Sequence, residues 1–180
     1  MNASKNSLFI FQSALILAVS LCLLFISNLT WAEALPVPKD RVILTIEGNI
    51  NQHNVSNTAQ FDLKTLEKLP MQTIKTTTRW TNGEQIFQGP SVRNLMQMVQ
   101  PGGSQIKATA LDGYSTPWMT IAELENYGVI LAIKKNGNYL RIRDKGPIWM
   151  MYPMHSYPGL KTDLSTQYKL IWHLRSLQIR

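Results

Sequence analysis

RIRDKGPIWMMYP, residues 141–153, is the most informative segment of this chain. It places three cations, one carboxylate and a Gly-Pro pair directly before a run of large apolar side chains. Such charges need a partner or solvent, because an unpaired buried charge is costly. The segment therefore indicates a strand end or loop where cationic and flat apolar groups meet a planar, anionic or hydrogen-bond-rich ligand. The competing interpretation is a core strand whose flanking charges are solvated.

The first part of the chain has the order of a secretory signal peptide. The apolar run Leu8–Ile26 follows a short region with Lys5 and precedes the small residues Ala32 and Ala34. This order predicts cleavage after Ala34, which leaves a leader of residues 1–34 and a mature domain of residues 35–180. Cleavage after Ala32 is an alternative. An uncleaved anchor is another, because a bilayer needs about 20 apolar residues.

Cysteine usage excludes several kinds of site. Cys22 is the only cysteine and lies inside the predicted leader, so the mature domain has no disulfide and no thiolate. Leu21 is too large for a lipoprotein cleavage site, so we predict no lipid anchor. The histidines are far apart and show no paired metal-ligand spacing; they are His53, His155 and His173.

The net formal charge of the chain is +7. The leader holds one cation, Lys5, and one anion, Glu33, so its removal leaves the charge unchanged. A basic exported domain suggests an anionic ligand, an acidic partner or a membrane surface. Nucleic acid is not expected as a partner, because an exported protein seldom meets it and the cations form no long run.

Residues 35–180 read as one α+β domain, mainly β, of many short strands with two or three short helices. Helix starts are predicted at Asp62, at Ser91 and at the capping box of Thr120 and Glu123. The helix after Ser91 carries apolar residues at i, i+3, i+4 and i+7. Residues 51–60 are predicted to form a loop. The predicted strands are residues 42–50, 71–79, 84–87, 106–111, 129–133, 139–143 and 168–179.

The order of several short motifs resembles a known family. They are FDLKTLEKLP (61–70), TRW (78–80), FQGPSVRNLM (87–96), ATALDGYS (108–115), LAIKKNGNYL (131–140), RDKGPIWMMYP (143–153) and a closing W-x-L (172–174). In this order they resemble the molybdopterin-binding domain of sulfite-oxidase-type oxidoreductases, over nearly the whole mature chain. The resemblance implies the sulfite-oxidase fold.

One departure from the family pattern changes the expected chemistry. Catalytic members coordinate molybdenum through a cysteine from the segment that corresponds here to TIKTTTRWTNGEQ, residues 73–85, which has no cysteine. Threonine hydroxyls do not replace a soft thiolate on such a metal. The resemblance therefore implies a pterin as ligand and no molybdenum.

The size, the leader and the missing cysteine are similar to those of stand-alone exported members of this fold. Some of these bind a pterin and regulate a membrane-bound cyclic-di-GMP enzyme. The resemblance implies a periplasmic protein that binds a reduced pterin and docks on the periplasmic domain of a membrane protein with GGDEF or EAL domains, a diguanylate cyclase or phosphodiesterase.

A pterin site needs an aromatic face for stacking and a carboxylate or backbone groups for the donor-rich ring edge. Trp80 with Arg79 lies near the position of the missing metal ligand, although Trp80 could equally cover the core. Asp112 and Tyr114 could offer a carboxylate and a phenol, although Asp112 could simply support the turn at Gly113.

The remaining candidates are in or after the opening segment and are Arg143, Asp144, Lys145, Gly146, Trp149 and His155. Asp144 could bind the guanidine-like ring edge or pair with a neighbouring cation. Gly146 permits close backbone approach. Trp149 could stack on the ligand, but strand alternation favours the core. His155 could close over a pocket from its loop, but an exposed histidine is the commoner case.

Three hypotheses follow. The first is a binding module that senses a pterin without catalysis. The second is a molybdenum-cofactor oxidoreductase with a metal environment that lacks cysteine. The third is an interaction protein that keeps the fold but has lost the pocket.

Overall fold

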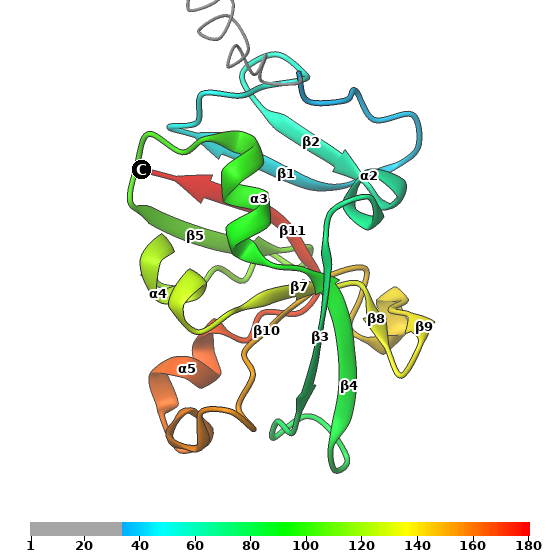
Figure 1. The fold of residues 1–180 in the computed structure, drawn as a ribbon, viewed down its shortest axis with the longest axis vertical. Helices are drawn as coiled ribbons and strands as arrows, with labels where there is room; N and C mark the ends of the chain where they lie inside the picture. The colour runs from blue at the N-terminus through cyan, green and yellow to red at the C-terminus, as the bar shows by residue number, and fades with distance from the viewer. Residues whose placement is uncertain (1–33) are drawn as a thin grey trace, which may run out of the picture. The chain divides into compact units, whose positions relative to one another are not determined.

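The five-stranded sheet at the centre of the fold joins segments from both ends of the domain. A computed structural model describes residues 34–180 (Figure 1), and the predicted leader up to residue 33 lies outside the described residues. The sheet order is β2-β1-β11-β5-β6, and β1 pairs in parallel with β11 while the other pairs are antiparallel. Its strands are β1 (Val42–Gly48), β2 (Ala59–Asp62), β5 (Gln105–Ala110), β6 (Met119–Thr120) and β11 (Leu174–Ile179).

Two smaller sheets complete the strand arrangement. One has the order β3-β4-β8-β9, and the other pairs β10 with β7. The long hairpin of β3 and β4 projects away from the five-stranded sheet (Figure 1). The strands are β3 (Met71–Thr76), β4 (Gln85–Pro90), β7 (Ile130–Ala132), β8 (Lys134–Lys135), β9 (Asn138–Tyr139) and β10 (Trp149–Met151).

The described residues contain four α-helices and two 3-10 turns, where the sequence predicts two or three helices. The helices are α2 (Leu63–Glu67), α3 (Val92–Val99), α4 (Ile121–Asn126) and α5 (Leu164–Lys169), and the 3-10 turns are Ile142–Asp144 and Pro158–Lys161. The mixed class with a majority of strands is confirmed. None of the helices among residues 34–180 has both the length and the apolar content that a bilayer crossing requires.

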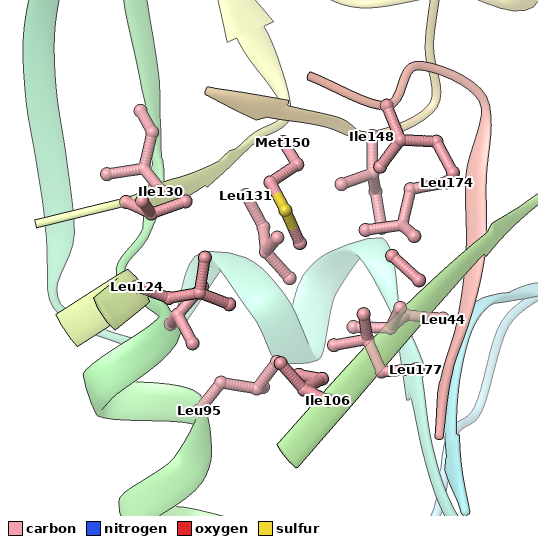
Figure 2. Packing of buried hydrophobic residues seen from close by; sticks show 14 of the residues in the cluster. Leu44, Leu95, Ile106, Leu124, Ile130, Leu131, Ile148, Met150, Leu174 and Leu177 are labelled. Carbon is pink, nitrogen blue, oxygen red and sulfur yellow. The ribbon is translucent and has the colours of Figure 1, made fainter. Parts of the chain in front are cut away.

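The hydrophobic core lies between the five-stranded sheet, α3, α4 and the β7–β10 pair. Figure 2 shows Leu95 of α3 and Leu124 of α4 near Ile106 of β5, with Leu131 and Met150 on the opposite side. The four apolar residues of α3 are all buried, as their helical spacing predicts; they are Val92, Leu95, Met96 and Val99.

All three predicted helix caps are present. The side-chain oxygens of Asp62, Ser91 and Thr120 each accept a hydrogen bond from the backbone N–H three residues later. The capping box is only half formed, because the Glu123 carboxylate bonds instead to Lys169 at 2.7 Å.

The predicted strand 168–179 is wrong in its first half. Residues 168 and 169 end α5, which begins after Asp163, whose carboxylate accepts from the backbone N–H groups of Ser165 and Thr166. The strand β11 starts only at Leu174. The alternation of Tyr168, Leu170, Trp172 and Leu174 therefore spans a helix end and a turn, because the Asp163 cap decides the local structure there.

Other boundaries also differ from the prediction, since β3 ends at Thr76 instead of residue 79 and β4 runs to Pro90 instead of residue 87. Only Tyr139 of the predicted strand 139–143 lies in a strand, because Ile142–Asp144 closes a 3-10 turn in which Asp144 binds Arg141. The predicted loop 51–60 already contains the first residues of β2, whose Ala59 and Gln60 pair with β1.

Replacement of Asp62 by alanine is expected to cost about 2 kcal/mol or more of unfolding free energy. Its buried carboxylate caps α2 and also accepts from the backbone N–H groups of Lys39 and Asp40, which would lose their partner. Hydrogen bonding by Thr65, and then by Asp40 and Lys39, holds the pKa of Asp62 well below its usual range against the opposing effect of burial.

The lowered pKa of Asp62 fixes the sign of the pH dependence. Its contribution is present above the unfolded-state pKa of about 4 and is lost as the pH falls toward the lower folded-state pKa. Urea unfolding should show that wild type and Asp62→Ala differ less in free energy of unfolding at pH 3 than at pH 7. An equal difference at both pH values would contradict the prediction that the ionised Asp62 carboxylate stabilises the fold.

Candidate functional site

A cavity of about 280 Å³ opens between the turn after β5, the loop after β3 and the end of α5. Three residues predicted as ligand-binding line it together, namely Trp80, Asp112 and Tyr114. The other lining residues are Ala110, Gln167, Tyr168, Leu170, Ile171 and Trp172. We refer to this space as the aromatic cavity.

The flat surfaces of the aromatic cavity come from two tryptophans. The rings of Trp80 and Trp172 meet edge to face, with centroids 5.1 Å apart and an interplanar angle of 72°. Lys145 Nζ lies 4.7 Å from the Trp172 ring centroid. Within the described part of the chain, no carboxylate lies within ion-pair distance of Lys145. An uncompensated cation therefore lies against one of the two rings, but Lys145, which was predicted as ligand-binding, does not itself line the cavity.

Threonine hydroxyls shape the loop that carries Trp80. The Thr78 hydroxyl accepts from the Trp80 backbone N–H at 3.2 Å, and the Thr81 hydroxyl accepts from the Thr78 N–H at 2.9 Å. The buried Thr76 hydroxyl donates to Tyr152 O and accepts from Met154 N–H. These hydroxyls therefore hold the backbone in place.

The Asp112 side chain supports its turn and also lines the cavity, so both sequence interpretations describe part of its position. Its Oδ1 accepts from the Tyr114 N–H at 3.0 Å, while Gly113 takes a positive φ of 89°. The Tyr114 hydroxyl donates to the Tyr168 carbonyl at 2.9 Å and so joins this turn to α5. Partial burial raises the pKa of Tyr114, which keeps the phenol a neutral donor at pH 7.

A second cavity, of about 420 Å³, lies on the other side of Gln167. Its lining includes two cations, Arg79 and Lys161, and neither has a carboxylate within ion-pair distance among residues 34–180. The remaining lining residues are Thr77, Thr78, Met154 and Leu164. We refer to it as the cationic cavity. Arg79 and Trp80 are adjacent in sequence but open onto different cavities.

The predicted residues of the charged segment are not gathered at one place. Asp144 binds Arg141 at 2.8 Å and lines a separate polar cavity, and this hydrogen bond lowers the pKa of Asp144. Arg143 is exposed, 3.9 Å from Asp144. His155 is also exposed, with Nδ1 3.5 Å from the Glu84 carboxylate. Neither Arg143, Asp144 nor His155 lines the aromatic or the cationic cavity.

Gly146 and Trp149 have positions typical of structural residues. A Cβ on Gly146 would collide with the backbone of Leu140, so the close approach is to the chain itself. Trp149 is 1 % exposed and packs edge to face against Phe87 at 5.4 Å. It also meets Trp172 at 6.2 Å, so it supports the wall of the aromatic cavity from behind.

Sequence reasoning missed six of the nine residues that line the aromatic cavity. Tyr168 and Trp172 belong to residues 168–179, which were predicted as one continuous strand, and Gln167 directly precedes them; this prediction hid their convergence. The usable signal was Asp163 itself, because aspartate is a favoured N-cap residue and marks a possible helix start before them.

The donor atoms near these cavities suit an organic ligand better than a thiolate-bound metal. Residues 34–180 contain no cysteine, and no group of three or more histidine, aspartate or glutamate residues there could hold a metal ion. A flat heterocycle would find two indole rings, a carboxylate and an amide.

A partly buried ion pair holds α5, and with it one wall of the cavity. Glu123 of α4 accepts from Lys169 Nζ at 2.7 Å and from the Tyr152 hydroxyl at 3.3 Å. Burial, together with the charge of Glu123, raises the pKa of Tyr152, so that the phenol stays protonated. The two helices are thus joined through one carboxylate.

Glu123→Ala is expected to lower the free energy of unfolding by about 1–3 kcal/mol, because Lys169 would stay partly buried without its partner. Glu125→Ala on the same helix is the control, because Glu125 forms no ion pair among the described residues. Denaturant titration of both variants measures the difference. Equal free energies of unfolding for the two variants would mean that the Glu123–Lys169 ion pair does not stabilise the fold.

Comparison with known proteins identifies the fold. No family model matches the chain, and no curated protein sequence matches it. Among solved structures, it is similar to the crystal structure of the sulfane dehydrogenase SoxCD from Paracoccus pantotrophus, with a TM-score of 0.56 and 17% sequence identity. The match covers 81% of this chain and 40% of that chain. The domain therefore has a fold found in SoxCD, in agreement with the sulfite-oxidase-type fold that the sequence resemblance implies.

Proposed function

We propose that this domain binds a reduced pterin in the aromatic cavity. The observation that supports this most is the convergence of Trp80, Trp172 and Asp112 on one small cavity in a domain of this fold. Indole rings offer stacking surfaces, and a carboxylate offers acceptors to the amino-pyrimidine edge of the ring. A volume of about 280 Å³ lies at the lower end of the range for small-molecule pockets, which suits a bicyclic ring.

The proposed role is sensing, without catalysis by a cysteine-bound molybdenum. The sequence has no cysteine after the predicted leader, and the nearby hydroxyls of Thr76 and Thr78 are engaged by backbone groups. The resemblance to stand-alone exported proteins extends this to a periplasmic adaptor. In that proposal, the pterin-bound domain docks on the periplasmic domain of a membrane GGDEF/EAL protein and modulates cyclic-di-GMP turnover.

Isothermal calorimetry and thermal shift with reduced pterins test the binding proposal. A ligand at 100 times its Kd should stabilise the domain by about 2.7 kcal/mol, which raises the Tm by several degrees. A matched compound with a similar size but a saturated, non-planar ring is the control. Absence of binding by every reduced pterin at about 1 mM would overturn the proposal, because it would leave a free energy weaker than about −4 kcal/mol.

A molybdenum-cofactor oxidoreductase is the alternative function. The fold likeness to a dehydrogenase supports its consideration. Metal analysis of protein purified from a host that makes the cofactor distinguishes the two proposals. Stoichiometric molybdenum would favour the enzyme, and its absence from protein that still binds a pterin would favour the sensor.

The regulatory proposal needs its own test. The cellular concentration of cyclic-di-GMP should change when this gene is deleted. It should return to its original value when wild-type protein is supplied, but not when Trp172→Ala is supplied. An unchanged cyclic-di-GMP concentration in the deletion strain would contradict the signalling role and leave the pterin-binding proposal standing. A neighbouring gene for a membrane GGDEF or EAL protein would identify the partner to purify.

A further inference from the structure

Gln167 forms the partition between the aromatic and the cationic cavity, because it is the one residue that lines both. It is 9% exposed and lies in the middle of α5. Its Nε2 faces two backbone carbonyls, those of Leu160 at 3.4 Å and Lys161 at 3.2 Å. Its Oε1 is buried and has no hydrogen-bond partner within the described structure.

The orientation of the Gln167 amide follows from its neighbours. The opposite orientation would set the amide oxygen against the two carbonyl oxygens of Leu160 and Lys161, which cannot donate a hydrogen bond. The acceptor Oε1 is therefore the side-chain atom of Gln167 that has no hydrogen-bond partner within the protein.

A buried acceptor without a partner is uncommon and costly in folded proteins. A glutamine exposed to solvent would not carry this free-energy cost, because water would bond to its oxygen. An apolar side chain would fill the same space and would carry no unpaired acceptor. Because the residue that carries this acceptor lines both cavities, a bound ligand is a candidate for the missing partner.

The other polar groups at the aromatic cavity point to the same ligand chemistry. Asp112 supplies a carboxylate, whereas the Tyr114 hydroxyl is already committed to the Tyr168 carbonyl. The available side-chain groups of Asp112 and Gln167 are acceptors, so the matching ligand edge is rich in N–H donors.

We propose that Gln167 is a specificity-determining residue, whose Oε1 accepts a hydrogen bond from the exocyclic amino group of a flat heterocycle in the aromatic cavity. This inference rests on the proposed pterin function and assigns the recognition of its donor edge. Because Oε1 is covered from water, the donor reaches it through a small displacement of the surrounding side chains on binding.

The test compares two ligands that differ at position 2 of the ring, a reduced pterin and the corresponding lumazine. The lumazine has an oxo group in place of the 2-amino group, and its neighbouring ring nitrogen carries a hydrogen. Wild type should bind the pterin about 10-fold more tightly or better, the size of one buried hydrogen bond. Gln167→Met, which keeps the length of the side chain and removes the acceptor, should bind both with affinities within about threefold of each other. Gln178→Met, on an exposed position of β11, is the matched control.

A measurement on wild-type protein makes the test independent of how well the variant folds. The side-chain ¹³Cδ resonance of Gln167 should shift with the pterin and move much less with the lumazine. Equal affinities of wild type for the two ligands, a preference retained in Gln167→Met, or equal shifts of the resonance would overturn the inference while pterin binding stands. If neither the pterin nor the lumazine binds, the proposed function itself is overturned.

Discussion

Trp149→Ala is expected to lower the free energy of unfolding by about 3–5 kcal/mol. The indole is 1% exposed and meets Phe87 and Trp172 edge to face at 5.4 and 6.2 Å. Truncation removes this packing and leaves a large cavity between β10 and β4, because the backbone of paired strands cannot collapse to fill it. Urea denaturation monitored by far-UV circular dichroism measures the loss.

Two variants make this prediction specific. Trp118→Ala, at a partly exposed position under Lys107 and Arg180, should cost much less, about 1 kcal/mol. Trp149→Phe should cost less than Trp149→Ala, because it keeps much of the ring and removes the indole N–H, which is buried without an acceptor. A loss below 1 kcal/mol for Trp149→Ala would show that the residue is not a core side chain.

Trp172→Ala is expected to weaken binding of a reduced pterin by about 10- to 100-fold, the range for loss of one stacking surface. Trp172 is half-buried, lines the aromatic cavity and lies beneath Lys145. Trp80→Ala should have a similar effect, and the double variant should bind less than either. Calorimetry at pH 7 measures the affinities.

Trp118→Ala also serves as the binding control, because it removes an indole that is stacked with cations but lies outside the aromatic cavity. Its pterin affinity should equal that of wild type. Full affinity in Trp172→Ala, with the fold confirmed by circular dichroism, would place the pterin elsewhere. The polar cavity beside Asp144 would then be examined next.

Much of the local structure could be predicted from short patterns. Asp62, Ser91 and Thr120 each begin a helix, because a side-chain oxygen three residues before a free backbone N–H satisfies it without help from distant segments. The buried face of α3 follows from its apolar spacing for the same local reason. The alternation after residue 168 misled the prediction, because period-two spacing over four residues competes poorly with the Asp163 cap.

The candidate site was predictable only in part. The motif order indicated Trp80, Asp112 and Tyr114, which do meet at one cavity. It also indicated Asp144 and His155, which the fold turns toward Arg141 and Glu84. Local patterns do not distinguish these outcomes, because each of these residues lies in or next to a turn and is polar or aromatic.

The sequence by itself determined the starts of α2, α3 and α4, the buried face of α3, and the lack of any thiolate ligand in residues 35–180. The tertiary structure decided which tryptophan faces a cavity and which fills the core, since Trp149 and Trp172 both directly follow an isoleucine in the sequence. It also decided that Gln167 is buried with an unpaired acceptor. The reason is that the cavity forms where the loop after β3, the turn after β5 and the end of α5 converge. Their contacts are long-range, and no short window of sequence contains them.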